Sequence, residues 1–231
     1  MTIEEFKNKN KIVFTDTNLL EQAFVHRSFI NENPRTGLVH NERLEFLGDA
    51  VLELIATEYL YAAYPHQNEG DLTAYRSALV NAVTLGELAT SLGFNDMMKL
   101  SKGEAKDVHR ARSSILADAY EAFVGALYID QGYEPTKEFI TRTLLGKTDE
   151  IIRKGLYKDA KSYVQEKAQE LHSVTPSYKV LSEEGPDHDK LFLVGIYFGE
   201  EKIAEGKGKS KQEAETVAAR AALEEKGWVA K

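Results

Sequence analysis

The sequence predicts a multi-domain protein with an all-α domain over residues 1–154, a linker over residues 155–159 and a small α+β domain over residues 160–228. Apolar residues recur at helical spacing through the first part of the chain and at the alternating spacing of strands after the linker. The stretch from Lys154 to Asp159 is charged and contains one glycine, which is typical of a connection. These observations favour two domains of different class.

Helix start and stop signals divide the first domain. Thr17 and Asn18 are suited to cap a first helix, Pro65 ends a long second one, and Asp71 is suited to cap a third that ends at Gly93. No internal repeat or low-complexity segment interrupts them. The predicted helices cover about residues 19–25, 41–64, 72–91, 112–131 and 135–154.

The second domain has the order α-β-β-β-α. Phe192, Val194 and Ile196 alternate with residues of the opposite face, as in a half-buried strand. An antiparallel three-stranded sheet with both helices on one face would bury this pattern. The predicted elements are a helix over 160–172, strands over 177–184, 191–198 and 201–206, and a helix over 212–226.

Composition excludes several classes of protein. The 231 residues are 42% hydrophobic, which is enough for real cores. Because cysteine is absent, the chain cannot form a disulfide, a thiolate zinc site or a thiol nucleophile. Apolar runs are shorter than the roughly 20 residues of a membrane span, and the N-terminus lacks the pattern of a signal peptide. We therefore expect a cytoplasmic protein with no membrane partner and no small-molecule cofactor.

The chain is acidic overall, whereas domains that bind phosphates are usually basic. The chain carries 29 Lys and Arg against 37 Asp and Glu, a net charge of −8, and residues 159–231 alone carry −3. Four lysines nevertheless gather between Lys202 and Lys211 with one acid among them, Glu205. Any nucleic-acid affinity is therefore expected to depend on a small basic patch and strongly on salt.

Acidic residues follow a helical spacing in two apolar segments. Glu42, Glu45 and Asp49 share one face of the predicted helix 41–64, and Asp118 and Glu121 are a second pair three residues apart. Acids on helices most often form a solvated face, but the apolar flanks here favour half-buried carboxylates. Two such acidic faces are suited to a hard divalent metal such as Mg²⁺, which prefers oxygen ligands.

Several segments together resemble a known family. The stretch Asn41–Asp49 reads Asn-Glu-Arg-Leu-Glu-Phe-Leu-Gly-Asp, the signature of the bacterial ribonuclease III family of double-stranded-RNA endonucleases. The segment that follows the linker resembles a double-stranded-RNA-binding domain, so the resemblance covers nearly the whole chain. The further matching segments, in the expected order, are His26-Arg27-Ser28, Asn68–Leu72, Gly103-Glu104 and Ser114–Ala122.

The resemblance implies Mg²⁺-dependent hydrolysis of phosphodiester bonds in double-stranded RNA, with Mn²⁺ as a substitute metal. The products would carry 5′-phosphate and 3′-hydroxyl ends with two-nucleotide 3′ overhangs, and ribosomal RNA precursors and other structured transcripts would be substrates. Glu104 matches an acid in an outer or RNA-facing role, and His26 is expected to be a buried structural imidazole. The implied metal ligands are Glu45, Asp49, Asp118 and Glu121, and the implied catalytic residues are Asp49, Glu121, Glu42 and Glu69.

The resemblance also implies RNA contacts in the second domain. Its first helix would contact the minor groove, a hairpin loop would carry His188, and the start of the last helix would contact phosphates. The family commonly has two adjacent basic residues at that start, whereas here Gln212 and Glu213 follow the lysine, so weaker RNA affinity is expected. The implied contacts are Gln165, Glu166, Gln169, His188, Lys209, Ser210 and Lys211.

One chain supplies one carboxylate cluster, and cutting both strands of a duplex needs two. The resemblance implies a homodimer in which Phe46 enters a pocket of the partner, although a plain core position for Phe46 is equally compatible with the sequence. A non-catalytic dimeric protein that binds double-stranded RNA remains an alternative function. A metal-dependent hydrolase of small phosphate esters is disfavoured, because the second domain would then have no purpose.

Overall fold

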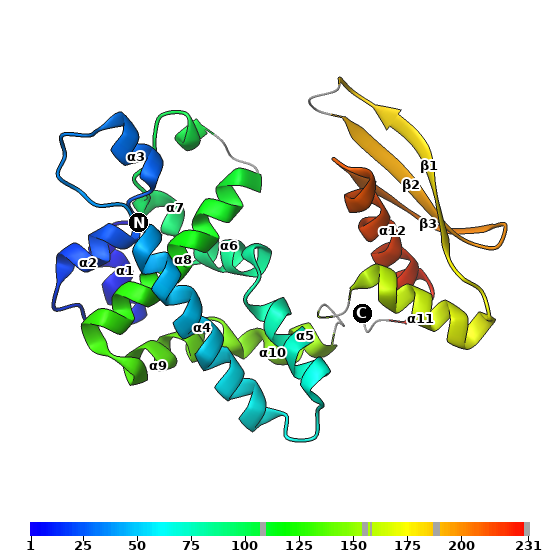
Figure 1. Ribbon diagram of the computed structural model, residues 1–231, viewed down its shortest axis with the longest axis horizontal. Coiled ribbons are helices and arrows are strands. Elements are labelled where there is room, and N and C mark those ends of the chain that lie inside the picture. The colour runs from blue at the N-terminus through cyan, green and yellow to red at the C-terminus, as the bar shows by residue number, and fades with distance from the viewer. Residues whose placement is uncertain (107–109, 154–156, 158, 187–189, 229–231) are drawn as a thin grey trace. The chain divides into compact units, whose positions relative to one another are not determined.

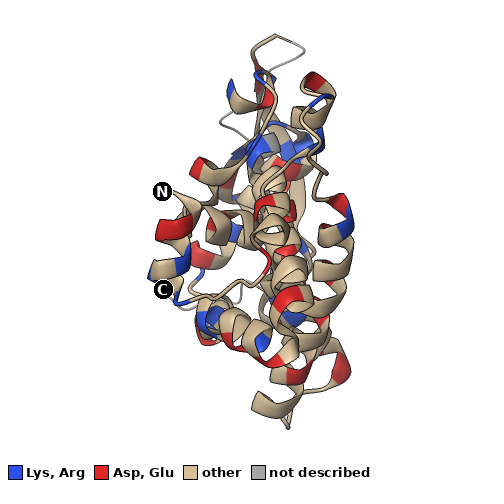
Figure 2. Ribbon diagram, turned by 90° about the vertical axis from the view of Figure 1, so that its left-hand side faces the viewer, with Lys and Arg blue, Asp and Glu red and all other residues tan. Residues whose placement is uncertain are grey.

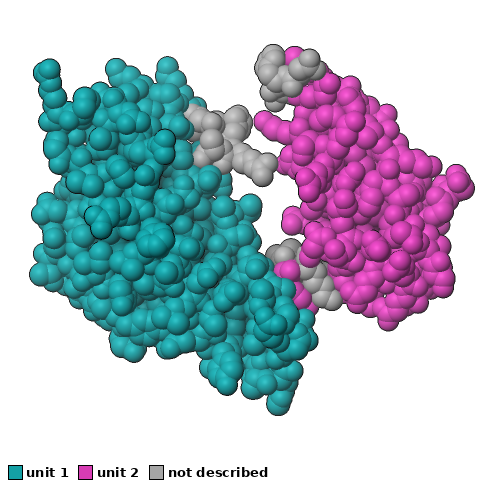
Figure 3. All heavy atoms as spheres, in the orientation of Figure 1, with its two compact units in different colours: residues 1–148 teal, residues 149–231 magenta. Residues whose placement is uncertain are grey.

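The computed structural model separates into two compact units, unit 1 (Met1–Thr148) and unit 2 (Asp149–Lys231) (Figure 3). The structure describes residues 1–106, 110–153, 157, 159–186 and 190–228, except the side chains of residues 110 and 111. Most of the linker predicted over residues 155–159 lies outside these ranges. Each unit has its own arrangement of elements (Figure 1).

Unit 1 is built from helices, which confirms the all-α class predicted for this part of the chain. None of the described helices is both long and apolar enough to cross a membrane. The elements are α1 (Ile3–Asn10), α2 (Thr17–Ala23), α3 (Arg27–Glu32), α4 (Glu42–Ala63), α5 (Glu69–Leu79), α6 (Ala82–Ser91), α7 (Phe94–Met97), η1 (Glu104–Lys106), α8 (Arg110–Gln131), α9 (Tyr133–Thr143) and η2 (Leu145–Lys147), followed by α10 (Thr148–Arg153) at the unit boundary.

The single helix predicted over residues 72–91 is wrong, because the chain forms α5 and α6 there. The Asn81 side chain accepts a hydrogen bond from the backbone N–H of Thr84 (2.9 Å) and donates to the carbonyl oxygen of Ala78 (2.9 Å). It therefore ends one helix and caps the next. The cap of α5 is Asn68, whose side chain accepts from the N–H of Asp71 (3.0 Å), and not Asp71 as predicted.

Two further predictions differ from the structure in their details. The helix predicted over residues 135–154 is divided into α9, η2 and α10, with the buried Thr148 hydroxyl donating to the carbonyl oxygen of Leu145 (2.6 Å). The cap of α2 is Asp16, which accepts from the N–H of Asn18 (2.9 Å), rather than Thr17 or Asn18. The short helices α1 and α3 were not predicted, because they contain too few residues to show a period.

Four phenylalanines form the centre of the core of unit 1. Phe6, Phe24, Phe94 and Phe123 are fully buried, and their ring centroids lie 5.0 to 6.5 Å apart. Most of these pairs meet edge to face, as the charge distribution of aromatic rings favours. Helix α8 runs through this core and packs against α2, α4 and α6.

Helices α4 and α8 cross at two glycines. A Cβ atom at Gly48 on α4 would overlap the carbonyl oxygen of Glu121, and one at Gly125 on α8 would overlap the carbonyl oxygen of Leu44. Only residues without a side chain let two helix backbones approach this closely. The crossing therefore brings the acids of α4 and α8 into the same interface.

Unit 2 confirms the predicted α-β-β-β-α order. Its strands form one antiparallel sheet in the order β1-β2-β3, and the last strand extends two residues beyond the predicted end at residue 206. The elements are α11 (Ala160–His172), β1 (Ser177–Glu184), β2 (Leu191–Phe198), β3 (Glu201–Gly208) and α12 (Lys211–Glu225).

The core of unit 2 lies between the sheet and its two helices. Val164 on α11, Ile196 on β2 and Ala218 on α12 are fully buried in it. A Cβ atom at Gly206 would overlap the backbone of α12 at Ala218, so β3 and α12 also depend on glycine for their close approach. This packing fixes the start of α12 beside the ends of the strands.

Candidate active site and RNA-contact surface

The close crossing of α4 and α8 brings three of the predicted metal ligands together. Glu45 on α4 and Asp118 and Glu121 on α8 each offer a carboxylate oxygen, and these oxygens all lie within 4.8 Å of one another. All three residues are partly buried. We call this group the carboxylate cluster.

The carboxylate cluster is electrostatically unfavourable without a cation. Burial, together with the negative charges of Asp49, Asp118 and Glu45, raises the pKa of Glu121 to about 8. Burial and the same kind of repulsion, from Asp118, Glu42 and Asp49, raise the pKa of Glu45 to about 7. Burial also raises the pKa of Asp118. A hard divalent cation would remove this repulsion, and three carboxylates are a suitable donor set for one.

Asp49 and Glu42 flank the carboxylate cluster on α4. Asp49 is exposed one turn after Glu45, and its charge acts on both cluster glutamates, but its oxygens are not among those within 4.8 Å. Glu42 accepts a charge-assisted hydrogen bond from Nη1 of Arg27 (3.2 Å), and its carboxylate lies 3.7 Å from Nδ1 of His40. Both acids therefore lie near the cluster without belonging to its most compact part.

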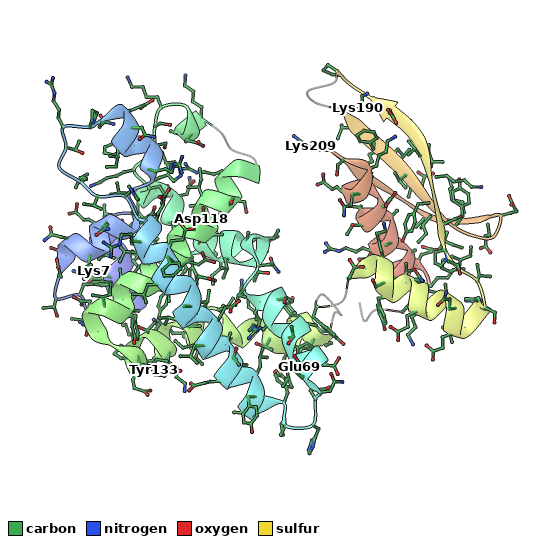
Figure 4. All side chains as sticks on the ribbon, viewed as in Figure 1. Lys7, Glu69, Asp118, Tyr133, Lys190 and Lys209 are labelled. Carbon is green, nitrogen blue, oxygen red and sulfur yellow. The ribbon has the colours of Figure 1, made fainter. Side chains whose placement is uncertain are left out.

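The two remaining acids differ in position. Glu104 lies in η1, and its charge acts on His26, which the charge of Asp118 also reaches. Glu69 lies at the first residue of α5, well away from Asp118 of the same chain (Figure 4). The structure therefore does not bring Glu69 to the carboxylate cluster of its own chain.

Phe46 points away from the core. Its side chain is 82% exposed, so the core position that the sequence left open is wrong. Leu54 and Tyr61 are exposed on the same helix, at spacings that continue the stripe of Phe46 along α4. An exposed apolar stripe of this kind is typical of an interaction surface.

Of the predicted RNA contacts, those on α11 and at the start of α12 lie within the described residues. Gln165, Glu166 and Gln169 are exposed on α11, and the Gln169 side chain donates to the hydroxyl of Thr175 (3.3 Å). His188 lies outside the described residues. Along the helices drawn in Figure 2, basic and acidic residues are interspersed.

The start of α12 is capped from within the chain. The Ser210 hydroxyl accepts from the N–H of Glu213 (3.1 Å), and the Glu213 carboxylate accepts from the N–H of Lys209 (2.9 Å). Lys211 forms an ion pair with Glu183 of β1 (3.0 Å) and lies over the ring of Phe192. Lys190 lies 3.7 Å from the same Glu183 carboxylate, at the same end of the sheet as Lys209 (Figure 4). Lys211 and Lys190 thus already have an acidic partner in Glu183.

Two features that position the site were not predicted from the sequence. Gly48 and Gly125 stand inside strongly helical segments, where glycine costs about 1 kcal/mol relative to alanine, and this cost was the available signal. The hydrogen bond from Ser101 to Ser28 joins residues 73 positions apart, and no local pattern indicates it.

Two family models match the chain. The model described as Ribonuclease-III-like matches residues 16–148, and the model described as Double-stranded RNA binding motif matches residues 160–226. The first match contains the carboxylate cluster, and the second contains all of unit 2 from α11 to α12.

Relatives of known identity cover nearly the whole chain. Ribonuclease 3 of Borreliella burgdorferi is 44% identical over 225 residues, which are 96% of this chain and 90% of that protein. Ribonuclease 3 of Streptococcus pneumoniae is 45% identical over 218 residues, 94% of each chain. The crystallised nuclease domain of ribonuclease III from Campylobacter jejuni is 39% identical with a TM-score of 0.55, and covers 61% of this chain and 92% of that domain. The chain therefore belongs to the ribonuclease III family, as an endoribonuclease of double-stranded RNA with a helical nuclease domain and a C-terminal double-stranded-RNA-binding domain.

Proposed function

We propose that this chain cleaves double-stranded RNA with Mg²⁺ held by Glu45, Asp118 and Glu121, and that Mn²⁺ can substitute. The ribonuclease III family uses divalent metal. We choose these three residues as ligands because they form the carboxylate cluster. The three partly buried carboxylates have raised pKa values, because burial, and in Glu45 and Glu121 also repulsion by nearby acids, disfavours their charged forms. They are hard oxygen donors, which suit a divalent cation. Asp49 completes the proposed ligand set from the exposed side of α4.

The side chains of the cluster have distinct tasks in this proposal. When bound, the metal lowers the pKa of water and offsets the negative charge that develops on the scissile phosphate. Glu45 and Glu121 hold it at the crossing of the two helices, and Asp49 and Glu42 face the entering RNA. Glu69 acts outside the cluster of its own chain. The products carry 5′-phosphate and 3′-hydroxyl ends.

We propose that the active form is a homodimer. One chain has one carboxylate cluster among its described residues, whereas cleavage of both strands needs two. The exposed Phe46 and the apolar stripe of α4 are suited to a symmetric interface beside the cluster. In the nuclease domain of ribonuclease III from Campylobacter jejuni, a region involved in dimer formation shows structural flexibility. Two sites related by a two-fold axis would leave two-nucleotide 3′ overhangs.

Unit 2 contributes recognition of duplex shape. In the proposal, Gln165, Glu166 and Gln169 reach the minor groove from α11, and Lys209, Ser210 and Lys211 reach phosphates from the start of α12. His188 completes the set from a loop outside the described residues. The functional parts are residues 1–154 and 160–228, joined at 155–159, and the enzyme acts in the cytoplasm on ribosomal RNA precursors and other structured transcripts.

The test compares cleavage by the wild-type chain and by Glu121→Gln. A perfectly paired RNA of a few helical turns is incubated with and without Mg²⁺, and the product ends are mapped. Glu121→Gln is isosteric and removes one hard ligand, so cleavage is expected to fall by about 1000-fold or more, with RNA binding nearly unchanged. Glu87→Gln, which changes an exposed acid of α6, is the matched control.

The ends of the products distinguish the parts of the proposal. Mg²⁺-dependent cuts in both strands with two-nucleotide 3′ overhangs support the metal, its ligand and the dimer together. Unchanged cleavage by Glu121→Gln would remove this residue from the metal site. Binding of the wild-type chain without any cleavage would instead favour the non-catalytic RNA-binding protein.

A further inference from the structure

The hydroxyl of Ser28 is a junction between two segments that are distant in sequence. It accepts a hydrogen bond from the backbone N–H of Ser101 (3.0 Å) and lies 2.8 Å from Nδ1 of His26. A hydroxyl has one proton and two lone pairs, so Ser28 can accept from Ser101 and still donate its proton to the histidine nitrogen. Ser28 therefore connects α3 to the segment that precedes η1.

The same segment carries Glu104. The hydroxyl of Ser101, a buried residue, accepts from the N–H of Glu104 (3.1 Å). A second contact holds this segment to α3, because the Glu32 carboxylate accepts from the N–H of Lys102 (3.0 Å). The position of Glu104 relative to α3 thus depends on a short chain of hydrogen bonds that begins at Ser28.

Geometry fixes the tautomer of His26. Its Nδ1 also accepts from the backbone N–H of Ser28 (3.3 Å), and a backbone N–H can only donate. Nδ1 is therefore the unprotonated nitrogen, and the neutral ring carries its proton on Nε2. Burial lowers the pKa of His26, which favours this neutral form.

His26 is within electrostatic reach of the carboxylate cluster, through the charge of Asp118. The charges of Glu104 and Asp118 are the two acidic charges that act on it most strongly, and they come from η1 and α8. The backbone N–H of His26 donates to the carbonyl oxygen of Lys99 (3.1 Å), so the backbone at this point is fixed as well. Nδ1 already accepts from Ser28. The Nε2–H group is therefore the remaining ring donor for an acid such as Glu104 or Asp118.

The backbone next to His26 also holds the start of α4. The carbonyl oxygen of Val25 accepts from the N–H of Asn41 (2.9 Å), and the buried Asn41 side chain donates to the carbonyl oxygen of Ala23 (3.1 Å). Asn41 precedes the first residue of α4, the helix that carries Glu45. The segment from Ala23 to Ser28 is therefore bonded both to the start of α4 and to the segment that carries Glu104.

We propose that Ser28 and His26 are positioning residues for the metal site. Ser28 holds the imidazole of His26 in the Nε2–H tautomer toward Asp118 and Glu104, and holds the segment of Ser101 at the rim of the carboxylate cluster. Outer hydrogen-bond partners of this kind orient metal ligands and raise metal affinity. The inference rests on the proposed metal site, and it assigns a task to two residues of the segment His26-Arg27-Ser28.

The first experiment measures Mn²⁺ binding directly, from the free Mn²⁺ signal in electron paramagnetic resonance. Ser28→Ala removes the junction, Ser28→Thr keeps a hydroxyl, and Ser91→Ala is a control that removes a serine hydroxyl bonded within α6. Ser28→Ala is expected to weaken Mn²⁺ binding by about 10-fold, with recovery to within about 3-fold in Ser28→Thr. Thermal unfolding is recorded for each variant.

The second experiment separates positioning from folding. His26→Gln keeps an N–H donor at a similar reach from the backbone, whereas His26→Ala keeps none, so Mn²⁺ affinity is expected to fall less in His26→Gln. With Mg²⁺ saturating, kcat for duplex RNA is expected to fall by about 10-fold in His26→Ala while KM for RNA changes less than about 2-fold, because RNA contacts are untouched.

The outcomes decide between two roles. A lower melting temperature with unchanged Mn²⁺ affinity and unchanged kcat in both alanine variants would make the segment merely structural and overturn the proposal. If the wild-type chain binds Mn²⁺ but cuts no RNA, the proposed function fails while the comparison of Mn²⁺ affinities still tests the positioning role. If the wild-type chain binds no Mn²⁺, both proposals fail.

Discussion

In both units glycines let two elements pack closely, but the charged side chains near this packing are mutually repelling acids in unit 1 and an ion pair in unit 2. In unit 1, Gly48 and Gly125 let two helices cross so closely that partly buried acids share one interface, and the charges that raise the pKa of Glu121 are all negative. In unit 2, Gly206 lets β3 approach α12, but the charged groups at the rim of that packing are exposed and paired, as in Lys211 and Glu183.

This difference separates the two tasks of the enzyme. Folding brings the acids of the carboxylate cluster together, so a bound cation would relieve the repulsion that folding created. On the proposed RNA-contact surface Lys211 already pairs with Glu183, so RNA would have to compete with this ion pair. We therefore expect large effects from changes at the α4–α8 crossing and small ones from changes at the start of α12.

The largest effect is expected from Gly48→Ala. The new Cβ would overlap the carbonyl oxygen of Glu121 and crowd the backbone nitrogen of Gly125, so α4 and α8 have to separate. We expect a loss of about 3 kcal/mol of stability, together with a loss of cleavage, measured by thermal denaturation and a duplex-RNA assay. The matched control is Gly146→Ala, because a Cβ there meets only an oxygen 4.0 Å away.

The sign of the change in stability caused by Gly48→Ala tests the close crossing of α4 and α8. In a helix without steric conflict, alanine is more favourable than glycine by about 1 kcal/mol. A variant that melts at a higher temperature than the wild type would therefore show that the two helices do not cross as closely as described, and that the acids meet in some other way.

The second prediction concerns pH and metal. The raised pKa values of Glu45, about 7, and of Glu121, about 8, mean that the folded state binds these protons more tightly than the unfolded state. The stability that this provides is fully present below about pH 4.5 and is lost as pH rises through 7 and 8. Without metal, the melting temperature is expected to fall by roughly 5 °C between pH 6 and pH 9.

Mg²⁺ is expected to reverse this trend, because it would bind the deprotonated ligands. The stabilisation by Mg²⁺ is expected to grow with pH over the same interval, as thermal unfolding with and without the metal would record. A double variant, Glu45→Gln with Glu121→Gln, should flatten both dependences. Equal pH dependence in that variant and in the wild type would place the responsible groups elsewhere.

Elements with strong local signals were predicted well from the sequence. The alternation of Phe192, Val194 and Ile196 predicted the observed bounds of β2. Pro65 predicted the end of α4 to within two residues. The break at Asn81 was missed because the apolar spacing continues across it, while a hydrogen bond of one side chain changes the backbone direction. Periodicity reports which face is buried, and does not report such single contacts.

The candidate site shows the same limit. Spacing alone places Glu45 and Asp49 on one face of α4, but the rotation of α4 against α8 decides that Glu45 joins the carboxylate cluster and that Asp49 stays exposed. That rotation follows from the two glycines at the crossing. Likewise, Ser28 and Ser101 meet across 73 positions of sequence, and only the folded chain brings them together.

The third prediction tests the RNA-contact surface. Lys211→Ala removes one exposed cation from the start of α12 and leaves the cap formed by Ser210 and Glu213. Binding to duplex RNA is expected to weaken by about 5-fold at physiological salt, equally for different sequences. The magnitude of the slope of the logarithm of the binding constant against the logarithm of the salt concentration is expected to decrease by about one. A loss confined to some sequences would contradict recognition by duplex shape.

The smallest effect is expected from Glu183→Gln. Glu183 lies 3.0 Å from Lys211 and 3.7 Å from Lys190, so it competes with phosphate for two lysines. The change removes this competition and a negative charge near the RNA. Exposed ion pairs contribute less than about 1 kcal/mol, so binding should tighten by about 2-fold, measured in a Glu121→Gln background that leaves the RNA intact.

Glu184→Gln provides the control for this last comparison, because it removes the same charge from the neighbouring position of β1, which pairs with Leu191 on the adjacent strand. If both variants bind RNA more tightly by the same factor, the gain comes from net charge and the pairing of Lys211 is irrelevant. If Glu183→Gln alone gains affinity, the ion pair sets the strength of RNA binding. Weaker binding in Glu183→Gln would mean that Glu183 orients Lys211 for phosphate rather than competing for it.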